Sequence, residues 1–188
     1  MKNGEAVPRG AASLASNIQA TSTGDAVKPQ VLTSEQFVPR PRDEVFAFFA
    51  RPENLGTITP PWLDFQVLTP SPVPMHQGAV IDYVIRLGAL PTSWRTMITS
   101  HDPPFRFVDE QLSGPYSFWH HTHEFVEKEG GTLIRDRVLY VLPMGDLGAL
   151  VAGPLIRRRL DAIFAHRRRV IGARFGAGAV IDHAPPMP

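Results

Sequence analysis

The chain has 188 residues, no cysteine, 19 lysines and arginines against 18 aspartates and glutamates, and 19 prolines. Its length suits one domain. The absence of cysteine excludes disulfides, thiolate metal sites and cysteine nucleophiles, and it favours a location in the reducing cytoplasm. A formal net charge of +1 gives no general attraction to nucleic acid. No apolar run approaches the roughly 20 residues that cross a bilayer, so we expect a soluble protein.

The aromatic residues, which supply much of the burial in a core, are confined to the stretch between Phe37 and Phe175. Residues 1–30 are mostly small and polar, and we expect them to form a flexible N-terminal tail. Near the other end the sequence becomes rich in glycine, alanine and proline, so residues 174–188 are expected to form a second flexible tail. The folded domain is therefore predicted over residues 31–173.

The patterns of alternation and of turn residues predict the elements in chain order. A strand over 31–38 is followed by two short helical segments at 43–50 and 54–59, after which the chain enters a strand at 63–68. The turns that follow are short enough for antiparallel hairpins. The further predicted strands cover residues 79–87, 93–100, 105–112, 117–127 and 132–142.

After Pro143 and Gly145 the apolar period changes from two to 3.6, which predicts a long terminal helix with a kink at Gly153-Pro154. The apolar face of this helix needs a partner, and the concave face of the sheet is the largest surface available. The predicted fold class is α+β, a curved antiparallel sheet of about six or seven strands around the helix, with a ligand cavity between them. The residues on the apolar face of the helix are Ile156, Leu160, Ile163, Phe164 and Ile171.

The period-two alternation of the strands predicts which side chains face this cavity. In the strand at 117–127, Trp119 and Phe125 mark one face as inward, and His121 and His123 share it. The same alternation on the neighbouring strands predicts further residues that face the cavity. The apolar face of the helix adds Arg167. The predicted ligand-binding residues are Trp119, His121, His123, Phe125, Asp136, Tyr140, Phe107, Asp109, Gln111, Trp94, Tyr83 and Arg167.

Several motifs spread over the chain from Gln36 to Ile171 resemble one protein family. They are Pro52, Asn54, Leu55, Ile58, Thr59, Pro60 and Pro61, then Gly114-Pro115-Tyr116, Trp119, His121, His123, Phe125, Gly130-Gly131-Thr132, Asp136, Val138, Tyr140, Pro143 and Gly145, then Ile163, Phe164, Arg167 and Arg168. Together they resemble the ligand-binding branch of the SRPBCC superfamily. That superfamily includes START-like lipid-transfer proteins, polyketide cyclase/dehydrases and coenzyme-Q-binding proteins. The resemblance implies the helix-grip fold, and it covers carriers and enzymes alike.

The inward histidines admit three interpretations. A His-x-His pair on a strand places two imidazoles on one face, so Asp136 or Asp109 could complete a metal site. No second short ligand motif accompanies them, and we predict no metal and no cofactor. His121 or His123 could instead act as a general acid or base, with Asp136 fixing the tautomer. The third interpretation is that both rings hydrogen-bond to polar neighbours and shape the cavity.

The arginines of the terminal helix also admit more than one role. Arg167 lies within the apolar arc, where it could bind a ligand carboxylate, pair with Asp109 or Asp136, or extend its head to solvent. The other arginines are scattered around the helix, which favours a solvated face over a nucleic-acid site. A transient contact with an anionic membrane surface is the alternative for this basic face. Its residues are Arg157, Arg158, Arg168 and Arg169.

These observations lead to two functional hypotheses. The first is a noncatalytic protein that binds or transports a hydrophobic small molecule, such as a lipid, a polyketide or a quinone, in the internal cavity. The second is a cofactor-independent cyclase/dehydratase that uses a His-Asp pair of the cavity for acid/base chemistry, with His121, His123 and Asp136 as the candidate catalytic residues. The sequence does not separate the two.

Overall fold

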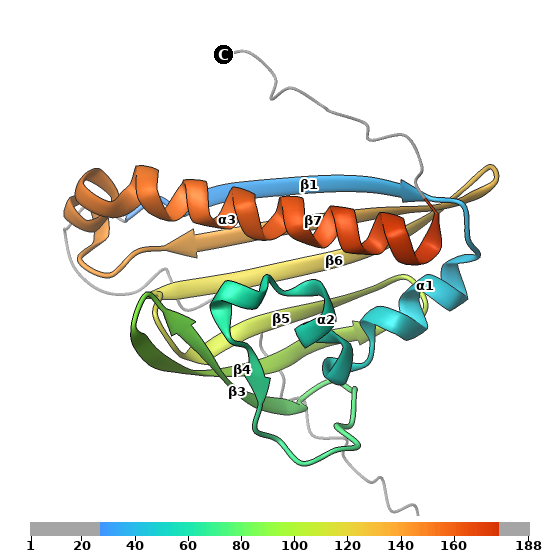
Figure 1. The fold of residues 1–188 in the computed structure, drawn as a ribbon, viewed down its shortest axis with the longest axis horizontal. Helices are drawn as coiled ribbons and strands as arrows, with labels where there is room; N and C mark the ends of the chain where they lie inside the picture. Colours follow the sequence, from blue (N-terminus) through green and yellow to red (C-terminus); the bar gives the residue numbers. More distant parts are fainter. Residues whose placement is uncertain (1–26, 177–188) are drawn as a thin grey trace, which may run out of the picture.

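Seven strands form one antiparallel sheet that curves around a long helix (Figure 1). The structure is a computed structural model, and it describes residues 27–176. The strand order is β1-β7-β6-β5-β4-β3-β2, so the first strand pairs with the last and the others follow as a meander. The strands are β1 (Gln30–Val38), β2 (Gln66–Val67), β3 (Val80–Leu87), β4 (Leu90–Asp102), β5 (Arg106–Ser113), β6 (Phe118–Lys128) and β7 (Gly131–Val141).

The helices complete the predicted architecture. Two short helices, α1 (Arg42–Phe49) and α2 (Leu55–Ile58), follow β1, and the long helix α3 (Gly145–Phe175) lies across one face of the sheet (Figure 1). Short 3-10 turns at Pro52–Asn54 and Pro61–Leu63 flank α2. The α+β helix-grip class, the antiparallel meander and the two short helices after the first strand are therefore confirmed.

Two strands differ in length from the prediction. The strand expected at 63–68 is reduced to Gln66–Val67, because the preceding residues form the 3-10 turn at Pro61–Leu63 and Asp64 adopts a left-handed conformation, with φ of 44°. The strand expected at 93–100 is longer and runs over Leu90–Asp102. The added residues 90–92 pair with the end of β3 across a tight turn, and the added residues 101–102 pair with β5. The alternation pattern alone does not reveal either extension.

The long helix also differs from the prediction at its C-terminal end. It continues to Phe175, past the expected start of the tail at 174, because the Phe175 ring packs edge-on against Phe48 with centroids 5.4 Å apart. The structure has one continuous helix through Gly153 and Pro154, where the sequence predicts a kink. Apart from residues 27–30 and 174–176, the two expected tails lie outside the described residues.

The core consists of two main clusters that meet beneath α3. One contains the phenylalanines of α1 and the C-terminal end of α3, and the other contains Trp94, Trp119 and Tyr140 with Leu160 and Phe164 of α3. His121 and His123 lie where the two clusters meet. The His123 ring stacks on Phe107 of the first cluster, with centroids 4.2 Å apart, and the His121 ring contacts Phe164 of the second.

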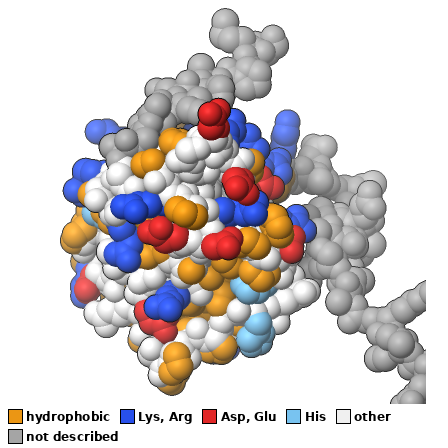
Figure 2. All heavy atoms as spheres, turned by 90° about the vertical axis from the view of Figure 1, so that its right-hand side faces the viewer, with side chains coloured by type: hydrophobic (Ala, Val, Ile, Leu, Met, Phe, Trp, Pro, Cys, Tyr) orange, Lys and Arg blue, Asp and Glu red, His pale blue; other side chains and the backbone are white. Residues whose placement is uncertain are grey.

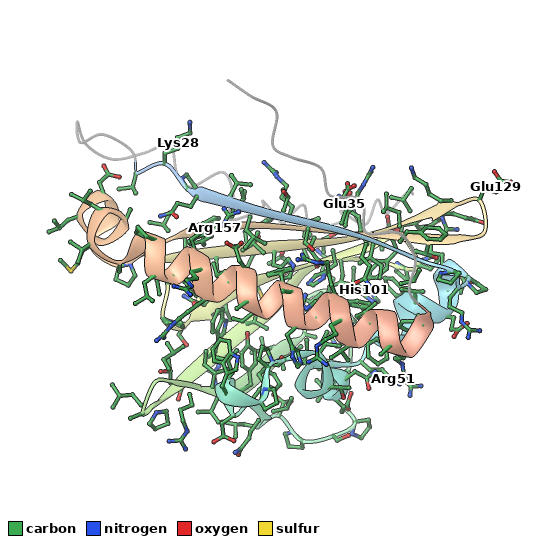
Figure 3. The ribbon with its side chains drawn as sticks, turned by 45° about the horizontal axis from the view of Figure 1, so that its top comes forward. Lys28, Glu35, Arg51, His101, Glu129 and Arg157 are labelled. Atoms are coloured by element: carbon green, nitrogen blue, oxygen red, sulfur yellow. The ribbon has the colours of Figure 1, made fainter. Side chains whose placement is uncertain are left out.

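The outer surface carries charges of both signs. Figure 2 shows one end of the molecule, where basic, acidic and apolar side chains are interspersed. Polar contacts tie α3 to β1: Arg157, labelled in Figure 3, donates to the Val31 carbonyl at 2.9 Å, and the Gln36 amide donates to the Arg168 carbonyl at 2.9 Å. Within residues 27–176, no helix is long and apolar enough to span a bilayer.

Candidate functional site

A cavity of about 600 Å³ lies between the sheet, the segment around α2 and helix α3. Most of its wall is apolar and aromatic. Of the twelve residues predicted to bind a ligand, eight line it. They are Tyr83, Trp94, Phe107, Asp109, Trp119, His121, His123 and Arg167.

The other four predicted residues do not line the cavity. Phe125 packs edge-on against the phenylalanines of α1. Tyr140 is buried, and its hydroxyl donates to the Gln30 side chain at 2.9 Å. The Gln111 amide donates to the Tyr116 carbonyl at 2.6 Å and so supports the turn between β5 and β6. Asp136, the fourth, lies behind the two histidines.

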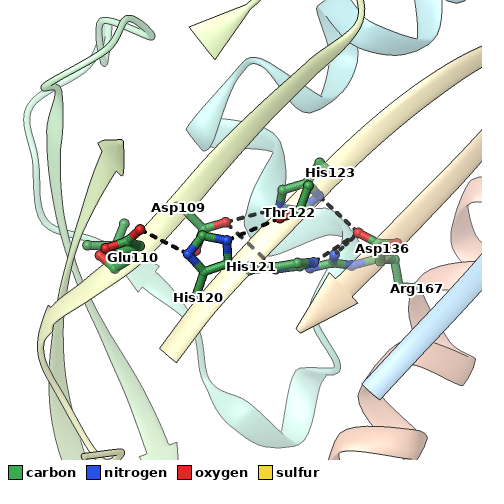
Figure 4. Close-up of polar contacts among 9 residues, drawn as sticks. Asp109, Glu110, His120, His121, Thr122, His123, Asp136 and Arg167 are labelled. Carbon is green, nitrogen blue, oxygen red and sulfur yellow. Dashed lines mark hydrogen bonds and ion pairs between the residues drawn. The ribbon is translucent and has the colours of Figure 1, made fainter. Parts of the chain in front are cut away.

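Three polar residues of the cavity wall, Asp109, His121 and His123, form a ring of alternating carboxylates and imidazoles with Asp136 (Figure 4). Asp136 Oδ1 lies 3.0 Å from His121 Nε2 and 2.9 Å from His123 Nδ1. Asp109 Oδ2 lies 3.0 Å from His123 Nε2 and 3.7 Å from His121 Nδ1. Each histidine therefore contacts both carboxylates, one from the strand on either side of β6.

Arg167 brings a cation to this ring from α3. Its Nη1 lies 3.6 Å from Asp136 Oδ1, which favours the internal ion pair among the alternatives considered for this arginine. Its Nε and Nη1 are buried, and neither has a hydrogen-bond partner among the described residues. Buried donors without partners are costly, and these lie on a side chain that lines the cavity. The guanidinium can therefore donate to an oxygen placed in the cavity.

Burial and the contacts within the cluster determine which of its side chains are ionised. Burial would raise the pKa of Asp136, but hydrogen bonds from His121 and His123 outweigh it, and the pKa lies well below its usual range. The pKa of Asp109 is lowered in the same way, against burial, by the hydrogen bond from His123 and by nearby positive charge. Both carboxylates are therefore ionised.

The two imidazoles have opposite shifts. Burial and the charge of His123 lower the pKa of His121 to about 4. Burial also disfavours the charged form of His123, but its contacts with Asp109 and Asp136 outweigh burial and raise its pKa. His123 is therefore the ring of the pair that binds a proton more readily, and His121 is neutral and donates from Nε2 to Asp136. With His123 protonated, Arg167 and His123 balance the two carboxylates.

A second histidine-carboxylate pair lies on the opposite face of the same two strands. His120 Nδ1 lies 2.9 Å from Glu110 Oε1, and both side chains are partly exposed. This pair is separated from the cavity by the sheet. His120 therefore takes no part in the polar cluster.

One wall of the cavity, formed by α2 and the first half of α3, was not predicted from the sequence. Leu147 and Val151 of α3 line the cavity together with Leu55 and Ile58 of α2. The spacing of apolar residues by three or four positions after Met144 was the available signal, since it defines a second apolar face on the helix.

The comparisons with known proteins agree with this architecture. Residues 38–165 match the family model described as polyketide cyclase/dehydrase and lipid transport. No curated protein matches the chain significantly. Among solved structures, the Zhui aromatase/cyclase from Streptomyces sp. R1128 is 15% identical, covers 78% of this chain and 93% of its own, and gives a TM-score of 0.60. TTHA0849 from Thermus thermophilus is also 15% identical, with a TM-score of 0.58, over 77% of this chain and 99% of its own.

A third solved structure has higher sequence identity but belongs to a larger protein. The nucleoside-diphosphate sugar epimerase from Corynebacterium glutamicum is 26% identical with a TM-score of 0.51, over 74% of this chain and 28% of its own. This chain therefore resembles one part of that protein. The likenesses at 15% identity show the fold alone, whereas the family model matches more than half of the chain. The chain belongs to the polyketide cyclase/dehydrase and lipid transport family of the SRPBCC superfamily.

Proposed function

We propose that this protein binds a hydrophobic small molecule that carries at least one polar, oxygen-bearing group. The observation that carries the proposal is the composition of the cavity wall, which is mostly aromatic and aliphatic. Its polar side chains include a cluster of Asp109, His121, His123 and Arg167, with Arg159 and two threonines elsewhere on the wall. Sites of this kind obtain affinity from apolar burial and orientation from a few polar groups.

The polar end of the ligand would lie against Arg167. Its buried Nε and Nη1 have no hydrogen-bond partner among the described residues, and an oxygen acceptor in the cavity would supply one. The buried Trp94 Nε1 donor is in the same situation, and Trp94 also lines the cavity. A lipid, a polyketide or a quinone-like molecule each combines an apolar body with such oxygens, and the description of the family refers to polyketides and lipids.

The ligand would enter beside the first half of α3. Trp62, Met144, Leu147 and Val151 line the cavity, and all four are exposed, Met144 to 73% and Val151 to 76%. Exposed apolar side chains at the edge of a cavity are typical of a binding surface. They provide an apolar path for a ligand between the outside and the cavity.

The remaining partner and location assignments stay predictions. Of the four arginines proposed to touch an anionic membrane surface, Arg157 contacts the Val31 carbonyl and Asp161, and Arg168 donates to Ser34. Arg158 and Arg169 are exposed and remain available for such a contact. The absence of nucleic-acid binding and the cytoplasmic location rest on composition.

An enzymatic role is the second candidate, and one observation favours it. The His121–Asp136 hydrogen bond of 3.0 Å places an oriented imidazole in the cavity wall next to the cationic Arg167. An oriented imidazole can transfer protons, and a neighbouring guanidinium can stabilise an oxyanion that forms on a bound polyketide. The aromatase/cyclase assignment printed for the Zhui structure belongs to a protein of the same fold.

Binding can be tested with 8-anilinonaphthalene-1-sulfonate, an aromatic anion whose fluorescence rises in apolar surroundings. We expect saturable binding of one probe per chain. Ala152 lines the cavity, so Ala152→Trp should weaken binding by about tenfold or more, because the indole would occupy the space of the probe. Ala165→Trp, on the exposed side of the same helix, is the control and should leave the affinity unchanged. Equal affinities for the wild type and Ala152→Trp would contradict the proposal.

The carrier and enzyme hypotheses can be separated with the natural ligand. Native mass spectrometry of gently purified full-length protein would identify a molecule that copurifies. That molecule is then incubated with the wild type and with His121→Gln at equal occupancy. A carrier returns it unchanged from both proteins. An enzyme converts it, and His121→Gln should lower the rate by roughly 10²- to 10⁴-fold.

A further inference from the structure

Three side chains of metal-binding type converge on one point of the cavity wall. Asp109 of β5 and His121 and His123 of β6 each offer a ligand atom, and these atoms lie within 4.8 Å of one another. We propose that Asp109, His121 and His123 form a binding site for a divalent first-row transition metal ion. The proposal does not depend on the cavity ligand.

The distances between the donor atoms fit such an ion. Asp109 Oδ2 lies 3.0 Å from His123 Nε2 and 3.7 Å from His121 Nδ1. In a tetrahedral zinc site with bonds of about 2.0 to 2.2 Å, neighbouring ligand atoms are roughly 3.3 to 3.5 Å apart. The two observed distances lie on either side of this value, and the two histidine nitrogens lie within 4.8 Å of each other. An ion would bond to all three atoms once side-chain rotations bring them to this spacing.

The second carboxylate strengthens the proposal, because it orients both rings from behind. Asp136 Oδ1 lies 3.0 Å from His121 Nε2 and 2.9 Å from His123 Nδ1, which are the ring nitrogens that do not face Asp109. In metal sites the non-ligating nitrogen of a histidine usually donates to a carboxylate, which fixes the tautomer and the ring orientation. Here Asp136 forms this hydrogen bond with His121 Nε2 and lies at ion-pair distance from His123 Nδ1.

The position of the site in the cavity suggests its type. Asp109, His121 and His123 line the cavity, whereas Asp136 does not. Figure 4 shows the contacts among these four residues. Three protein ligands with an open position toward a cavity are characteristic of catalytic rather than structural metal sites. Two imidazoles and one carboxylate suit zinc, iron, cobalt or nickel better than magnesium or calcium.

The net charge of the side chains around the proposed site also favours the binding of a cation. With both imidazoles neutral, as metal ligation requires, the two aspartates outnumber Arg167 by one negative charge. Arg167 Nη1 lies 3.6 Å from Asp136 Oδ1, and Asp136 is the carboxylate that would not bind the ion. A divalent ion together with an anionic ligand oxygen at the open position would leave the site neutral.

The chain contains its own matched control. His120 and Glu110 are a histidine-carboxylate pair at 2.9 Å on the same two strands, but they lie on the opposite face and offer one imidazole instead of two. His120→Gln therefore removes an imidazole from β6 without touching the proposed site. It should leave metal binding unchanged.

The test is titration of full-length, chelator-treated protein with Zn²⁺ by calorimetry and with Co²⁺ by visible absorption. We expect one ion per chain, and intense d–d bands of low-coordinate Co²⁺. His123→Gln and Asp109→Asn should abolish the bands and lower the Zn²⁺ affinity by at least about 100-fold, and Asp136→Asn should lower it by about 10- to 100-fold. Equal affinity in the wild type and Asp109→Asn, or loss of binding in His120→Gln, would overturn the proposal.

Two further measurements keep the test decisive if a variant folds poorly. Zn²⁺ should raise the melting temperature of the wild type and of His120→Gln, because the folded state alone presents the three ligands together. Crystals of the wild type soaked in ZnCl₂ should show anomalous scattering between Asp109 and the two histidines. An ion found elsewhere, or no melting shift at saturating Zn²⁺, would refute the site.

Discussion

The imidazole rings of His121 and His123 lie with centroids 3.7 Å apart and planes inclined by 37°. Two imidazolium ions at this distance would repel each other strongly, and this contact avoids that repulsion because the pKa of His121 is lowered to about 4 and the pair lies between two ionised carboxylates. The contacts between these carboxylates and imidazoles also connect β5, β6 and β7.

The first prediction concerns the stability of this cluster. Asp136→Asn should lower the free energy of unfolding by about 3 kcal/mol, because it removes the buried anion that faces His121, His123 and Arg167 and leaves excess positive charge. Urea unfolding followed by tryptophan fluorescence measures the loss. The control is Asp82→Asn, which breaks the exposed ion pair with Arg95 and should have a much smaller effect. Similar losses in the two variants would show that the cluster is not an ionised, paired network.

The inward face of β6 could be predicted because alternation is a local property of a strand. Two large aromatic residues at positions 119 and 125 fix the direction of every second side chain between them, and His121 and His123 follow. The buried helix face from Leu160 to Ile171 could be predicted for the same reason, with a period of 3.6. Local periodicity thus accounts for most of the fold and for the polar residues of the cavity.

The partners of the two histidines could not be predicted, because they depend on register between strands. In the ladders Asp109 lies opposite His121 and Asp136 lies opposite His123, yet both histidines also reach the carboxylate of the diagonal position. The neighbouring β4–β5 pair shifts register twice, and no feature of the sequence marks either shift. The alternatives of Asp109 or Asp136 therefore had to remain open until the structure was known.

The second prediction concerns the end of α3, which the sequence analysis assigned to a tail. Phe175→Ala should destabilise the protein by about 3 kcal/mol, because the ring is 4% exposed and packs against Phe48. The measurement is the midpoint of thermal or urea unfolding. Phe105→Ala removes a ring that is 48% exposed and should cost much less. If both variants melted together with the wild type, the helix would end before Phe175 in solution.

The third prediction concerns the hairpin between β6 and β7. A Cβ atom at Gly131 would collide with the Val38 carbonyl oxygen and lie 2.8 Å from Pro39 Cα, so the end of β1 would have to move. Gly131→Ala should therefore lower the free energy of unfolding by about 2 kcal/mol. Gly56→Ala is the control, since its Cβ would meet Phe65 at an ordinary 3.7 Å. A neutral Gly131→Ala in urea unfolding would mean that β1 and the hairpin do not approach this closely.

The last prediction concerns the polar end of the cavity ligand. Arg167 keeps Nε and Nη1 buried without a hydrogen-bond partner among the described residues, so an anionic ligand should gain from them, whereas a neutral ligand of the same shape should not. Two probes form a matched pair: 8-anilinonaphthalene-1-sulfonate, and N-phenyl-1-naphthylamine, which lacks the sulfonate. Arg167→Met should weaken binding of the anion by about 10- to 100-fold, because a hydrogen bond to a charged group contributes roughly 1.5 to 3 kcal/mol.

Binding of the neutral amine to Arg167→Met should change little, since methionine preserves an apolar wall. Arg169→Met, an exposed position two residues along the helix, is the control and should leave both affinities unchanged. If Arg167→Met weakened the binding of both probes equally, the substitution would have deformed the cavity. If it left the affinity for the anion unchanged, Arg167 would pair with Asp136 and would not contact the ligand.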